Sequence, residues 1–185
     1  MQTATLFILL APVFIALVWA LLIYNRLVRL RLHVRESWSD IDVQLKRRHD
    51  LIPNLVATVR GYAAHETAVL ENVTRLRSEA ARGDLSPRHA GAAEAPLAAG
   101  LSRLFAVAEN YPALKADTQF LALQRELAET EDRIAAARRF FNANVRDLNT
   151  LCEQFPTTLV ASATGFRPVD FFQLDSAAER VVPRV

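Results

Sequence analysis

Apolar residues recur three and four positions apart along most of this chain, which is the spacing of one face of an α-helix. These stripes predict helices over residues 26–49, 51–81, 97–108 and 115–154, and a short helix over 157–163. Long runs of Ala, Leu, Arg and Glu favour helix over sheet. Because the stripe over 115–154 needs long partners, we expect an all-α fold: an N-terminal transmembrane helix followed by an elongated antiparallel bundle of three to four long helices, packed like a coiled coil.

The segment 38–56 combines a membrane-proximal helix with a proline. Its apolar stripe has one interruption, Arg48. Pro53 has no amide hydrogen, and a proline inside a regular helix costs about 3 kcal/mol. Asp50 can cap a new helix whose first turn contains Pro53. We therefore expect a break or sharp kink between His49 and Asp50, with a second long helix directly after it.

The first 25 residues carry no charged side chain, and residues 6–23 are almost wholly apolar. A helix over 6–23 is about 27 Å long, close to the ~30 Å hydrocarbon core of a bilayer. No Lys or Arg precedes this run, so we expect an uncleaved single-pass anchor rather than a signal peptide. By the positive-inside rule we expect the N-terminus to lie outside the cytoplasmic membrane and the C-terminal domain to be cytoplasmic. This orientation follows from four arginines that would also reach lipid headgroups, Arg26, Arg29, Arg31 and Arg35.

The stretch from residue 86 to 109 has the weakest helical pattern. Gly91, Pro96 and Gly100 interrupt an alanine-rich sequence, so a helix is expected only over 97–108. Ser86 and Pro87 nevertheless form a helix-start signal, a capping side chain followed by a proline at the first helical position.

Three predicted parts follow from these patterns: a transmembrane anchor at 1–25, a helical bundle domain at 26–163 and a C-terminal tail at 164–185. The tail has no clear periodicity, although it contains Phe171 and Phe172. We expect it to be extended or disordered unless these aromatic side chains dock on another part of the protein.

Beyond the general pattern, the segment from Trp38 to Val56 resembles the most characteristic part of the LemA family of bacterial membrane proteins. The similarity covers most of the chain and includes Gly61-Tyr62, Glu109-Asn110-Tyr111-Pro112, Val145-Arg146-Asp147 and Gly165-Phe166. It implies a single-span membrane protein with a helical domain. The family has no well-established biochemical activity, so the resemblance implies an architecture and no reaction.

Little in the sequence favours catalysis. His65 begins a sequence similar to a zinc-protease helix, but Val69 stands where the second histidine would be. His49 and Asp50 could hold a divalent ion or serve a hydrolase, and this is kept as a minor alternative. The single Cys152 excludes an intrachain disulfide, and a net charge of +2 gives no reason to expect nucleic acid. We therefore expect neither enzyme activity nor a cofactor nor a metal.

The predicted function is a non-enzymatic scaffold or signalling adaptor that acts by protein–protein interaction at the membrane. Its partner-binding region is expected to comprise Trp38, Asp40, Asp42, Lys46, Arg47 and Arg48, together with Gly165 and Phe166 in the tail. The alternative is a membrane-shaping or membrane-stress protein that self-assembles into homo-oligomers. Expected partners are the lipid bilayer and an unidentified membrane or cytoplasmic protein. A membrane metalloprotease is conceivable, because members of the resembled family are sometimes encoded beside such enzymes.

Overall fold

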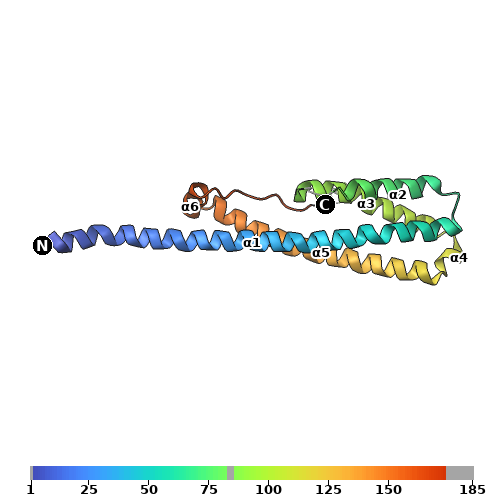
Figure 1. Ribbon diagram of the computed structural model, residues 1–185, viewed down its shortest axis with the longest axis horizontal. Coiled ribbons are helices and arrows are strands. Elements are labelled where there is room, and N and C mark those ends of the chain that lie inside the picture. The colour runs from blue at the N-terminus through green and yellow to red at the C-terminus, as the bar shows by residue number, and fades with distance from the viewer. Residues whose placement is uncertain (1, 83–85, 174–185) are drawn as a thin grey trace, which may run out of the picture. The chain divides into compact units, whose positions relative to one another are not determined.

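The computed structural model describes residues 2–82 and 86–173, with side chains from residue 10 onward in those ranges. All regular elements in this part of the chain are helices, which confirms the predicted all-α class. In chain order they are α1 (Gln2–Tyr62), α2 (Thr67–Ala80), α3 (Pro87–Ala108), α4 (Pro112–Lys115), α5 (Thr118–Glu153) and α6 (Thr157–Ala163), as Figure 1 shows.

The helices belong to two compact units. One unit comprises Met1–Ser37 and Phe141–Val169, and the other comprises Trp38–Phe140 and Asp170–Val185. Helices α1 and α5 each contribute one part to each unit. The tail is described as far as residue 173, so the prediction for residues 174–185 lies outside the described part of the chain.

Helix α1 continues through Pro53 to Tyr62, so the predicted break at His49 is wrong. Pro53 cannot donate a hydrogen bond to the carbonyl of His49, four residues earlier. Arg77 of α2 donates its Nε–H to that carbonyl instead, at 2.7 Å. The acceptor that proline leaves without a donor is therefore satisfied from a neighbouring helix. The chain turns after Tyr62, where the N–H of Glu66 donates to the carbonyl of Ala63 at 3.1 Å.

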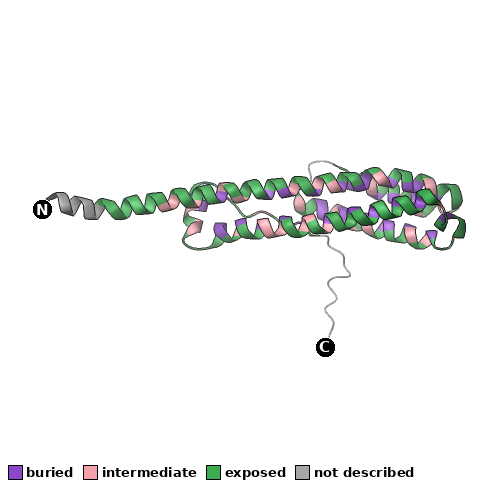
Figure 2. Ribbon diagram, turned by 90° about the horizontal axis from the view of Figure 1, so that it is seen from below, coloured by how far each residue is buried: buried purple, intermediate pink, exposed green. Residues whose placement is uncertain are grey.

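In the second unit, parts of α1 and α5 pack with α2 and α3 as an antiparallel bundle. Tyr62 donates to Asp117 at 2.9 Å and Arg48 donates to Glu131 at 2.7 Å, so α1 and α5 run in opposite directions. The buried positions coloured in Figure 2 include the apolar core of this bundle. Its members include Ile52, Leu55, Val59, Leu70, Val73, Leu97, Leu104, Leu114, Phe120 and Leu127.

Helix α3 begins at Pro87 rather than at residue 97. The side chain of Ser86 accepts a hydrogen bond from the N–H of His89 at 3.4 Å, and Pro87 occupies the first turn. The helix-start signal at Ser86 and Pro87 therefore marks the true start of α3, and the glycines that follow do not prevent the helix from forming. Gly91 is buried because the tail crosses it, and a Cβ at this position would lie 2.9 Å from the carbonyl carbon of Gln173. The tail aromatic Phe172 is also buried, with its ring 5.6 Å from that of Trp38.

The first unit joins α1 to the C-terminal part of α5 and to α6. Asn144 of α5 donates to the hydroxyl of Ser37 on α1 at 3.2 Å. Asn149 donates to the carbonyl of Val169 at 2.9 Å and accepts from its N–H at 2.8 Å, which fixes the start of the tail on α5. The short helix α6 confirms the prediction for residues 157–163.

Among the described residues, α1 is the one helix long and apolar enough to cross a membrane. Its most apolar window of 18 residues has a mean hydropathy of 1.8, and 6% of that window is buried within the protein. An apolar helix surface of this length matches the hydrocarbon core of a bilayer. The length and composition of α1 therefore fit a single-pass membrane protein.

Candidate functional site

A group of buried charges lies in the second unit, centred on Arg48 of α1. The side chains of Arg48 and Glu94 are both 1% exposed, and they form an ion pair. Arg48 also donates to the partly exposed Glu131 on α5 at 2.7 Å. His49 completes the group, with its Nε2 2.8 Å from the second carboxylate oxygen of Glu94. Arg48, the residue that interrupts the apolar stripe, thus belongs to a network of ion pairs that connects α1, α3 and α5.

Glu94 stays ionised in this setting. Burial alone would raise its pKa, but the hydrogen bond with His49 and the positive charge of Arg48 outweigh that effect, so the pKa of Glu94 lies below its ordinary value. Both oxygens of the carboxylate already have partners, Arg48 on one and His49 on the other. Glu94 is therefore positioned to hold the bundle together, because its carboxylate on α3 bonds two neighbouring side chains of α1.

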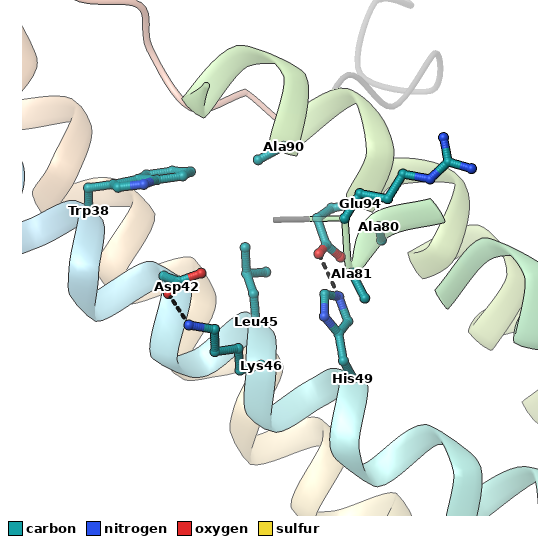
Figure 3. A pocket seen from close by; sticks show the side chains of 10 residues that line it. Trp38, Asp42, Leu45, Lys46, His49, Ala80, Ala81, Ala90 and Glu94 are labelled. Carbon is teal, nitrogen blue, oxygen red and sulfur yellow. Dashed lines mark hydrogen bonds and ion pairs between the residues drawn. The ribbon is translucent and has the colours of Figure 1, made fainter. Parts of the chain in front are cut away.

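Above this group a pocket of about 280 Å³ opens between α1 and the α2–α3 hairpin (Figure 3). Trp38, Asp42 and Lys46 line it from α1, and Ala90 lines it from α3. His49 and Glu94 also line it. Asp42 and Lys46 form an exposed ion pair at 2.7 Å, and the hydrogen bond from Lys46 to Asp42 raises the pKa of this lysine. Arg82 adds a second cation to the lining.

The structure separates the residues that the sequence suggested as one partner-binding region. Asp40, Lys46 and Arg47 are exposed and Asp42 is half-buried, whereas Arg48 is buried. Arg47 lies 4.0 Å from Glu126. Trp38, Asp42 and Lys46 meet at the pocket, and Arg47 and Asp40 do not line it.

The remaining predicted site residues belong to the first unit. Gly165 has a positive φ of 74°, a conformation that glycine adopts without strain, and it follows Thr164, the residue that caps the end of α6. Phe166 is buried, with the guanidinium of Arg31 4.5 Å from its ring centroid. The other predicted headgroup contacts, Arg26, Arg29 and Arg35, are exposed.

Sequence reasoning missed Glu94, although a signal was present. Glu94 lies three residues before Leu97 and four residues after Ala90, so it occupies the apolar face of α3 as Arg48 occupies that of α1. A lone acid on one stripe and a lone base on another are the pattern of a buried ion pair.

The geometry gives no support to the hydrolase alternative. His49 is buried against Glu94, while Asp50 is exposed, so the two do not converge on one site. Within residues 2–82 and 86–173, no group of three or more histidine, cysteine or acidic side chains is placed to hold a metal. Burial raises the pKa of the Cys152 thiol, and the negative charge of Glu153 raises it further, so the thiol is poorly suited to act as a nucleophile.

With this geometry in view, comparison with known proteins identifies the family. Residues 37–185 match the LemA family, a span that includes the pocket and the buried charges. The chain belongs to the LemA family. The resemblance noted in segment 38–56 is thereby confirmed.

Curated relatives carry two different names. Magnetosome protein MamQ of Magnetospirillum gryphiswaldense is 27% identical over 181 residues, which cover 84% of this chain and 66% of that protein. MamQ 2 of Paramagnetospirillum magneticum is 26% identical with the same coverage. Protein LemA of Metamycoplasma hominis is 27% identical over 157 residues, covering 85% of this chain and 71% of the relative. The chain thus spans slightly under two thirds of the MamQ proteins, and it is similar to proteins whose names are not those of enzymes.

Proposed function

We propose that this LemA-family protein is a non-enzymatic adaptor that binds a protein partner from the surface of the cytoplasmic membrane. The anchor is α1, and the arginines that follow its apolar run orient the domain toward the cytoplasm. Confinement to a membrane raises the effective concentration of the domain for membrane-associated partners without any new contact.

One observation carries the proposal. The charged residues near the pocket divide into two sets: Arg48, Glu94 and His49 are buried and paired with one another, while Asp42 and Lys46 are accessible at the pocket. The buried set serves the fold. The accessible set lies beside the half-buried Trp38, and protein interfaces are enriched in aromatic side chains and surrounded by a polar rim.

The proposal is tested by recovering the full-length protein from detergent-solubilised membranes and comparing two charge reversals. Lys46→Glu changes the pocket, and Lys115→Glu changes the other lysine of the chain, which is exposed on α4. We expect Lys46→Glu to lose a protein that the wild type and Lys115→Glu both retain. Identical protein sets in all three samples would refute the proposed site.

The orientation is tested separately, by adding protease to intact spheroplasts. A cytoplasmic domain stays protected until the membrane is opened, whereas cleavage of intact spheroplasts would place the domain outside.

In the recovery experiment, isolation of only the protein itself from membranes would favour the self-assembling alternative over the adaptor.

A further inference from the structure

The turn that carries α6, residues 154–166, has no charged side chain between Glu153 and Arg167. It exposes large apolar groups: Phe155 is 75% exposed and Leu159 is 59% exposed. An uncharged segment with exposed apolar side chains marks a surface that meets lipid or another protein.

Helix α6 lies beside the apolar part of α1. Leu17, Leu21 and Tyr24 of α1 and Leu159 of α6 line one apolar cleft of about 380 Å³. Along the axis of α1, Leu17 lies about 13 Å before Arg26. One leaflet contributes about 15 Å of hydrocarbon, so a cleft that reaches Leu17 lies at the depth of the lipid acyl chains when the arginines lie at the headgroups.

Several main-chain groups of the turn have partners within the protein, as such a depth favours. In a bilayer, polar main-chain groups must find partners within the protein, because water is scarce. Hydroxyl groups of the turn supply extra donors to main-chain carbonyls at 2.6–2.8 Å. Ser162 donates to Thr158 and Thr164 donates to Val160, while the single O–H of Thr157 is shared between the carbonyls of Gln154 and of Leu151 at the end of α5. The N–H of Phe166 donates to the carbonyl of Ala161 at 2.9 Å, and Pro156 has no N–H to satisfy.

Two aromatic contacts hold the turn against α1 at the edge of the apolar run. The ring of Phe166 lies edge-on to Tyr24, with centroids 6.2 Å apart. The guanidinium of Arg31 lies over the ring of Phe166, 4.5 Å from its centroid. An apolar ring between a tyrosine and an arginine is the composition of a membrane interface, where aromatic belts and cationic side chains meet the headgroups.

We propose that the turn at 154–166 is a second membrane contact. In this arrangement α6 and Phe155 enter the leaflet on the domain side, and a lipid acyl chain fills the cleft between α6 and α1. Lipid is favoured as the occupant because the cleft is continuous with the apolar surface of the transmembrane helix, and because the turn carries no charge with which a protein partner could be selected.

The experiment uses spin labels on the full-length protein in vesicles of phosphatidylethanolamine and phosphatidylglycerol. Cys152→Ala removes the native thiol, and single cysteines are then introduced as Phe155→Cys, Leu159→Cys and Phe140→Cys. Phe140 is a matched control, an apolar side chain on α5 that is 61% exposed and lies outside the turn. Collision of each label with oxygen, which partitions into lipid, is compared with collision with a water-soluble nickel chelate.

We expect the labels at 155 and 159 to collide preferentially with oxygen and the label at 140 to collide preferentially with the chelate. A preference for the chelate at all three positions would overturn the proposal. Low collision with both reagents at 155 and 159, with dipolar broadening between labels, would show that a second copy covers the turn and would overturn lipid as the occupant. A preference for oxygen at all three positions would also overturn it, because the turn would then not be distinguished from the rest of the domain.

Discussion

Arg48 and Arg47 are neighbours in the sequence with opposite environments, and this contrast gives the sharpest test of how the domain is stabilised. The side chain of Arg48 is 1% exposed and paired with Glu94, which is equally buried. Replacing Arg48 with methionine keeps a long apolar stem but leaves the Glu94 carboxylate with His49 as its remaining partner. Removing one member of a buried ion pair costs about 3–5 kcal/mol, because the other charge stays buried.

Arg47 supplies the matched control. Its guanidinium lies 4.0 Å from Glu126, and both side chains are about half exposed, at 45% and 49%. An ion pair of this kind contributes less than about 1 kcal/mol. Arg47→Met should therefore leave the free energy of unfolding close to that of the wild type.

The assay is thermal unfolding of the full-length protein in detergent, followed by far-UV circular dichroism. For a domain of this size, about 2–4 °C of Tm corresponds to each kcal/mol, so Arg48→Met should lower Tm by about 6–20 °C. The double variant Arg48→Met/Glu94→Gln removes both charges and should lose less stability than the sum of the two single variants, by about 0.5–3 kcal/mol. Equal Tm values for Arg48→Met and Arg47→Met would refute the reasoning.

Three further predictions use other contacts of the second unit. Arg77→Met should lower the free energy of unfolding by about 1.5–3 kcal/mol, because a charged donor to a main-chain carbonyl is lost. The loss should be much smaller in a Pro53→Ala background, where residue 53 regains an N–H that can donate to the same carbonyl. Equal losses in the two backgrounds, measured by urea unfolding, would contradict this. Gly91→Ala should displace the tail and speed its cleavage by chymotrypsin at the buried Phe172, whereas Gly61→Ala, whose Cβ would meet no atom within 4 Å, should stabilise α1 by about 0.5–1 kcal/mol and leave Phe172 protected. The pKa of Glu94 is lower in the folded protein than its ordinary 4.5, so the stability that its ionised carboxylate contributes is present above pH 4.5 and is lost as the pH falls through the folded-state pKa. The difference in unfolding free energy between wild type and Glu94→Gln should therefore narrow on acidification. A difference that does not change with pH would contradict the ion pair.

The parts of the fold that depend on local signals could be predicted from the sequence. The long stripe over 115–154 corresponds to α5, and Pro156 lies three residues after the end of this helix. Ser86 and Pro87 start α3, although the expectation placed the start at residue 97 because three helix-weakening residues follow. In the structure two of these, Gly91 and Gly100, provide close packing, since a Cβ at Gly100 would lie 3.0 Å from Leu76.

The parts that depend on distant partners could not be predicted. Pro53 was expected to break the helix because the rule for proline considers one helix alone. The donor that allows the helix to continue is Arg77, 28 residues from the carbonyl that it serves. Likewise the partner of Arg48 is Glu94, 46 residues away, and its position on the opposite stripe became meaningful only when α1 and α3 were placed side by side.

The sequence predicted a partner-binding surface but no pocket. Trp38, Asp42 and Lys46 were expected to form a binding surface, and the structure brings them together. Helical periodicity placed Arg48 on the apolar face of its helix and Arg47 off that face, but it could not show which acid each arginine meets on another helix.

The adaptor proposal is tested most directly by photo-crosslinking in living cells from a photoreactive residue at position 46. The same group at position 115 serves as the control, since both native lysines are exposed. The account predicts a discrete crosslink to another protein from position 46 that is absent from position 115 and is lost when Trp38 is replaced by Ala. The same crosslinks from both positions, or none to another protein from position 46, would contradict it.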